Sequence, residues 1–147
     1  MAESTRTWLP RFDRKPLMWG IILGMAAKVG CSLFMTIVTH DYLTSRGWTP
    51  AQIHAFFGQQ FQSWMLLVIG LIPEMMGGLA GGYMAAKIAP RLEYWHGSCA
   101  LLLMELITYG PVLMRVPVVF TVLAVSTALL LAMLGAGWAK MHKPQII

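Results

Sequence analysis

The sequence predicts an all-α membrane protein, a bundle of four transmembrane helices with both termini in the cytoplasm and a kinked second helix. The chain of 147 residues is 57% hydrophobic and 12% charged, with a mean hydropathy of +0.63, whereas soluble domains are typically about 45–50% apolar. Four stretches reach or approach the roughly 20 apolar residues that cross a bilayer. The length fits a single integral membrane domain, residues 1–147.

The distribution of Lys and Arg predicts the topology. If the N-terminus is cytoplasmic, only Arg46 and Arg115 fall outside, and Lys28 lies within a helix. The basic residues that fall inside are Arg6, Arg11, Arg14, Lys15, Lys87, Arg91, Lys140 and Lys143. Because cytoplasmic loops carry an excess of Lys and Arg, we expect both termini inside, in a bacterial-type inner membrane. Topology thus explains the net charge of +5 without a nucleic-acid partner.

The first expected transmembrane helix covers residues 17–39 and follows a polar, basic cytoplasmic lead-in, residues 1–16. Gly20, Gly24 and Lys28 recur in it at a spacing of four residues, so they lie on one face. Small residues permit close helix approach. A charged residue within a span should face protein rather than lipid.

The outer loop, residues 40–62, contains a signal for a helix start. Thr49 is suited as N-cap, Pro50 as first helical residue and Gln52 as the third, which together form a capping box. A short helix is therefore expected to begin at Pro50. Its mixture of aromatic residues and glutamines suits the membrane interface.

The second expected helix, residues 63–86, is apolar but contains a carboxylate, a proline and two glycine pairs. One row at a spacing of four residues is Gly70, Glu74, Gly78 and Gly82, and the adjacent row is Pro73, Gly77 and Gly81. These overlapping GxxxG motifs predict a helix-packing groove on the face of Glu74. Pro73 removes one backbone hydrogen bond and predicts a kink just before Glu74.

The last two helices are expected at residues 96–114 and 117–138, joined by a tight outer turn. The third contains Glu105. The fourth has no ionisable group and carries a row of alanines at a spacing of four residues, which predicts close packing. The row consists of Ala124, Ala128, Ala132 and Ala136.

Lys28, Glu74 and Glu105 form the candidate ion or proton site. Each lies near the centre of its expected helix, so all three reach a similar depth close to the bilayer midplane. A charged residue at that depth costs about 2.5–3.5 kcal/mol on the insertion scale. One ammonium against two carboxylates leaves a surplus negative charge, which one bound proton or cation would neutralise.

Two functions fit this pattern. The first is a small proton- or cation-coupled transporter or channel component, in which the carboxylates accept the charge. The second is an accessory or assembly subunit of a larger membrane complex, in which the charges are structural clasps. Simple pairing leaves the second carboxylate unexplained, which favours transport. Because four helices enclose little volume, we expect a homo-oligomer or a larger complex within the lipid bilayer.

The sequence gives no sign of an enzyme, a metal site or a cofactor. The signatures GxSxG and HExxH do not occur. The four histidines lie at helix ends or in loops, and most of the twelve methionines are scattered. Cys31 and Cys99 both fall inside expected helices, without a CxxC motif. We therefore expect no cofactor, no metal and no catalytic residue.

Overall fold

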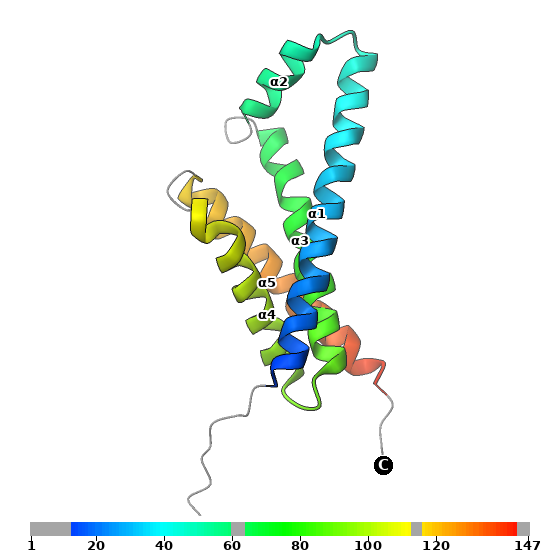
Figure 1. The fold of residues 1–147 in the computed structure, drawn as a ribbon, viewed down its shortest axis with the longest axis vertical. Helices are drawn as coiled ribbons and strands as arrows, with labels where there is room; N and C mark the ends of the chain where they lie inside the picture. Colours follow the sequence, from blue (N-terminus) through cyan, green and yellow to red (C-terminus); the bar gives the residue numbers. More distant parts are fainter. Residues whose placement is uncertain (1–12, 60–63, 113–115, 144–147) are drawn as a thin grey trace, which may run out of the picture.

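The computed structural model describes residues 13–59, 64–112 and 116–143, and these residues form helices and turns without a strand (Figure 1). The elements are α1 (Arg14–Ser45), α2 (Pro50–Gly58), α3 (Trp64–Ile88), α4 (Glu93–Tyr109), the short 3-10 helix η1 (Gly110–Val112) and α5 (Val118–Met141). The predicted all-α class is confirmed for the described part of the chain.

In the described part of the chain, three helices are long and apolar enough to cross a membrane: Arg14–Ser45, Leu66–Ile88 and Val118–Met141. The predicted span 17–39 lies within the first of these helices, and the predicted span 117–138 overlaps the third except for its first residue, Pro117, which is the N-cap. The predicted span 63–86 coincides with most of the second. The structure therefore supports a membrane protein with three candidate spans among its described residues.

The fourth span and the orientation of the termini stay predictions. Helix α4 contains 17 residues, about 26 Å at 1.5 Å per residue, somewhat less than the roughly 30 Å of the hydrocarbon core. It begins before the predicted residue 96 and ends at Tyr109, where a 3-10 turn follows. Pro111 contributes to this end, because proline has no backbone N–H to donate to the carbonyl of Ile107 four residues earlier. Residues 113–114 of the predicted span lie outside the described residues.

Helix α1 is longer than the predicted span at both ends. At its start, the Asp13 carboxylate accepts a hydrogen bond from the backbone N–H of Lys15 at 3.1 Å, so the last residues of the expected lead-in are helical. At its end the helix continues to Ser45, into the expected outer loop. Gly47, two residues after this end, has a φ of +82°, a backbone conformation that suits glycine.

Helix α2 begins at Pro50, the position that the capping box indicates. The Gln52 side chain accepts a hydrogen bond from the Thr49 backbone N–H at 2.8 Å, and the Thr49 hydroxyl accepts one from the Gln52 N–H at 3.4 Å. Ile53 is buried, and Phe56 contacts Trp48 edge to face. The short helix is thus fixed by its own first turn.

Replacing Thr49 with alanine is expected to lower the free energy of unfolding by about 1 kcal/mol, because the first turn of α2 loses its side-chain acceptor. Denaturant unfolding in lipid nanodiscs measures this loss. Thr49→Ser is the matched control and keeps the hydroxyl, so it is expected to stay close to the wild type. Equal losses in both variants would show that the cap does not stabilise α2.

Helix α3 packs between α1 and α5 (Figure 1). One of its glycine rows contacts α1 and the other contacts α5. A Cβ on Gly81 would lie 2.9 Å from the carbonyl oxygen of Gly20 on α1. On the other row, a Cβ on Gly82 would lie 2.6 Å from the Cα atom of Ala132 on α5. Only glycine permits such close backbone approach. Instead of the single packing groove that the sequence predicts, α3 makes two close helix crossings, one with α1 and one with α5.

The alanine row of α5 is fully buried at Ala124, Ala128, Ala132 and Ala136. Two of its members face the glycines of α3, so small residues meet small residues across this crossing. Pro73 lies inside α3, and the helix continues on both sides of it. The predicted kink at Pro73 stays a prediction.

A clasp near the C-terminal end of α5 joins the ends of three helices. The Lys143 ammonium donates a hydrogen bond to the carbonyl oxygen of Ala89 after α3 and one to the Glu93 carboxylate of α4 at 3.2 Å. Burial raises the pKa of the Glu93 carboxyl, but its backbone hydrogen bond and Lys143 outweigh this effect, so the pKa lies below its usual value.

Candidate ion or proton site

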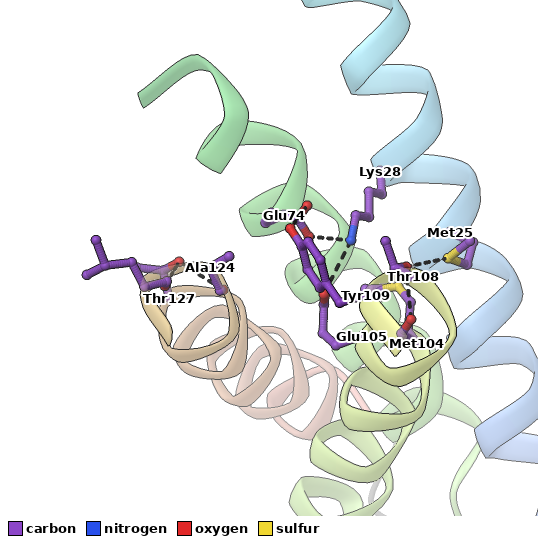
Figure 2. Close-up of polar contacts among 10 residues, drawn as sticks. Met25, Lys28, Glu74, Met104, Glu105, Thr108, Tyr109, Ala124 and Thr127 are labelled. Atoms are coloured by element: carbon purple, nitrogen blue, oxygen red, sulfur yellow. Dashed lines mark hydrogen bonds and ion pairs between the residues drawn. The ribbon is translucent and has the colours of Figure 1, made fainter. Parts of the chain in front are cut away.

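The three predicted site residues come together where α1, α3 and α4 meet (Figure 2). Lys28 is supplied by α1, Glu74 by α3 and Glu105 by α4, and their exposed fractions are 7%, 6% and 4%. The close crossing of α1 and α3 at their glycines brings Lys28 onto Glu74, since a Cβ on Gly77 would lie 3.1 Å from the Cβ of Lys28. The glycine rows thus position the charges.

Lys28 contacts both carboxylates. Its ammonium donates a hydrogen bond to Oε2 of Glu105 at 3.3 Å and forms an ion pair with Oε2 of Glu74. The same ammonium lies 4.9 Å from the centre of the Tyr109 ring, within the range of a cation–π contact. Lys28 is therefore enclosed by two carboxylates and an aromatic face.

Tyr109 is the fourth member of the cluster, and its hydroxyl donates a hydrogen bond to Oε1 of Glu74 at 2.7 Å. It lies four residues after Glu105, so both side chains leave the same face of α4. Tyr109 is not among the site residues predicted from the sequence. Its spacing from Glu105 was the available signal, but only the fold shows that the hydroxyl meets Glu74.

Two buried carboxylate oxygens in the cluster have no hydrogen-bond donor: Oε2 of Glu74, which has only its ion pair with Lys28, and Oε1 of Glu105. Buried polar atoms are normally hydrogen-bonded. A proton on either carboxyl group would supply a donor and remove the surplus negative charge. The arrangement is chemically suited to hold one exchangeable positive charge.

A cavity of about 390 Å³ lies beside the cluster, lined mainly by α1 and α3, with single residues of α2 and α5 and the end of α4. Lys28, Glu74 and Tyr109 line it, together with Ser32 and Thr36. Gly70 and Pro73 of the predicted site also line this cavity. The remaining predicted residues, Gly77, Gly78, Gly81 and Gly82, lie at the helix crossings instead.

The described residues outside the cluster include further candidate metal ligands and nucleophiles. No group of three or more His, Cys, Asp or Glu side chains is placed to hold a metal ion there. Cys31 and Cys99 are free thiols. His96 is buried, and its ring contacts the Leu92 carbonyl at 3.0 Å and the Asp13 backbone N–H at 3.3 Å. This histidine therefore helps to join the start of α1 to α4.

The comparisons with known proteins add no relative from which a role could be transferred. No protein-family model matches the chain, and neither the curated proteins nor the solved structures contain a match. The functional argument therefore rests on the site itself.

Replacing Tyr109 with phenylalanine is expected to lower the free energy of unfolding by about 1.5–3 kcal/mol, because a hydrogen bond to a buried charged group is lost. Denaturant unfolding in lipid nanodiscs measures the effect. Tyr42→Phe, at a half-exposed tyrosine of α1, is the control and should change stability by less than about 0.5 kcal/mol. A Tyr109→Phe variant as stable as the control would contradict the role of this hydroxyl.

Proposed function

We propose that this chain is a small multi-pass component of a proton- or cation-coupled transporter or channel in a bacterial-type inner membrane. Glu74 and Glu105 accept one exchangeable proton or small cation, and Lys28 is the fixed counter-charge. The observation that carries the proposal is the pairing of two buried carboxylates with one ammonium beside a cavity that Glu74 lines. Intramembrane ionisable groups of this kind mark ion pathways and proton relays.

The cavity supports exchange on Glu74 in particular. Lys28 contacts both carboxylates, so its single positive charge leaves one negative charge in the cluster without compensation. Tyr109 donates a hydrogen bond to Glu74 but adds no positive charge. Of the two carboxylates, Glu74 is the one that lines the cavity, through which a proton or cation reaches it. The bundle is small, so we expect copies of the chain to complete the pathway as a homo-oligomer, which the purified chain can form.

Glu74→Gln is expected to reduce proton flux at least about tenfold while the protein stays folded, because the amide cannot bind the proton. The measurement is acidification of liposomes that contain the purified full chain and a pH-sensitive dye, under an imposed membrane potential. Glu93→Gln removes a carboxylate outside the cavity and is expected to keep the flux. Flux that is unchanged in Glu74→Gln, or absent in the wild type, would overturn the proposal.

A second candidate is an accessory or assembly subunit of a larger membrane complex. The exposed apolar surface of α1 beyond Lys28 favours it, since large side chains there, such as Leu33, Phe34 and Ile37, are 59–64% exposed. Lipid or a partner helix can cover such a surface. This candidate predicts a complex of defined mass in mild detergent that Lys28→Met dissociates, and a wild type without proton flux.

A further inference from the structure

The cavity beside Glu74 is much larger than a proton or a bare metal ion needs. Its volume of about 390 Å³ falls in the usual range of small-molecule sites, about 300–1,000 Å³, and far exceeds the roughly 30 Å³ of one water molecule. A hard divalent cation such as Ca²⁺ takes 6–8 oxygen ligands, whereas the only carboxylate among the described residues that line the cavity is Glu74. The volume therefore fits an organic molecule.

The charge around the cavity is suited to a cation. Lys28 lines the cavity, and its single ammonium contacts both Glu74 and Glu105. One of the two carboxylate charges is therefore left without compensation, and of the two carboxylates Glu74 is the one at the cavity wall. An anionic ligand would meet this carboxylate, whereas a monovalent cation would neutralise it.

Most of the other lining residues are apolar or aromatic, and the polar ones are Ser32, Thr36 and Thr108. Phe57 of α2, Phe120 of α5 and the Tyr109 ring line the cavity, together with Met25 and Met35 of α1. Aromatic faces attract organic cations, and methionine side chains adapt to varied apolar shapes. The walls therefore complement an apolar body attached to the charge.

Pro73 leaves the backbone carbonyl of Ile69 available as an additional hydrogen-bond acceptor. Proline has no backbone N–H, so the carbonyl of Ile69, four residues earlier, lacks its regular helical donor at this position. Ile69 and Pro73 both line the cavity next to Glu74. A carboxylate and a backbone carbonyl without its regular donor, both from residues that line one cavity, suit a ligand whose positive group carries N–H donors.

We propose that this cavity binds one monovalent organic ammonium ion with an apolar body, whose charged group contacts Glu74. This inference deepens the proposed function and rests on it, because the ammonium ion replaces the proton or small cation as the charge that Glu74 exchanges. Phe57, Phe120 and Tyr109 hold the apolar body, and Glu74 with the Ile69 carbonyl holds the ammonium group.

The test is equilibrium dialysis of radiolabelled phenethylammonium against the full chain in lipid nanodiscs, with empty nanodiscs subtracted. We expect saturable binding of one ion per chain, at least about tenfold tighter than that of the uncharged analogue 2-phenylethanol. Glu74→Gln is expected to weaken binding at least about tenfold, and Glu93→Gln to leave it unchanged. Equal binding of the uncharged analogue, or full binding by Glu74→Gln, would overturn the inference.

A further variant separates this inference from the proposed function. Ser32→Phe places a ring in the cavity and leaves Lys28, Glu74 and Glu105 in place. We expect it to weaken phenethylammonium binding at least about tenfold while Glu74-dependent proton flux persists. If the wild type shows proton flux but does not bind phenethylammonium, only the inference of an organic ammonium ligand is overturned. Absence of Glu74-dependent flux would overturn the proposed function.

Discussion

Lys28→Met is expected to lower the free energy of unfolding by about 3–5 kcal/mol, because removal of one partner leaves buried charges without compensation. Lys28 contacts Glu74 and Glu105, and all three residues are at most 7% exposed. Methionine has a similar length and keeps the apolar stem contacts, so the loss reports the missing charge. Denaturant unfolding in lipid nanodiscs provides the measurement.

The double variant Lys28→Met with Glu105→Gln is expected to recover at least about 1 kcal/mol of this loss, since contacting residues couple by about 0.5–3 kcal/mol. Lys87→Met is the matched control. Lys87 is exposed on α3, and its ammonium lies 5.5 Å from the centre of the Tyr83 ring. Removing this ammonium should lower the free energy of unfolding by no more than about 1 kcal/mol. Strictly additive losses for Lys28 and Glu105 would contradict the coupling between the two residues.

The same measurements separate the two roles of the charges. If the cluster is a clasp, Glu74→Gln destabilises the protein, because the carboxylate contributes its ion pair with Lys28. If Glu74 is retained for exchange, the uncharged amide is tolerated, since the Lys28–Glu105 hydrogen bond persists and no surplus charge remains buried. A Glu74→Gln variant that is as stable as the wild type but lacks proton flux is therefore the expected result.

The sequence predicted the charge cluster from depth alone. Lys28, Glu74 and Glu105 each lie near the centre of an apolar stretch, and buried charges must find partners. Depth does not say which helices are neighbours, so the sequence left open which carboxylate meets Lys28. The crossing of α1 and α3 at their glycines resolves this point, and Lys28 contacts both carboxylates.

Features that depend on several helices at once were not predicted. Tyr109 belongs to the site because α4 packs against α3, and a tyrosine near the end of an apolar stretch has no pattern that reveals such a contact. The cavity depends on five elements, from α1 to α5, so periodicity within one segment does not indicate it. By contrast, the start of α2 was predicted because Thr49 and Gln52 act within one turn.

Gly82→Ala and Gly30→Ala make the same chemical change and are expected to have opposite effects. A Cβ on Gly82 would lie 2.6 Å from the Cα of Ala132, so α3 and α5 must separate, at a cost of about 3 kcal/mol. A Cβ on Gly30 of α1 would meet nothing within 4 Å. Alanine there should stabilise the helix by up to about 1 kcal/mol, because it restricts the unfolded chain.

Unfolding of both variants in lipid nanodiscs tests whether the glycine rows are helix crossings. Separation of α3 from α5 also moves Glu74, which lies on the same row two turns before Gly82. Gly82→Ala is therefore expected to reduce proton flux together with stability, whereas Gly30→Ala should keep the flux. Equal stability of the two variants would mean that the backbones of α3 and α5 are not in contact. The α3–α5 crossing would then not explain the position of Glu74.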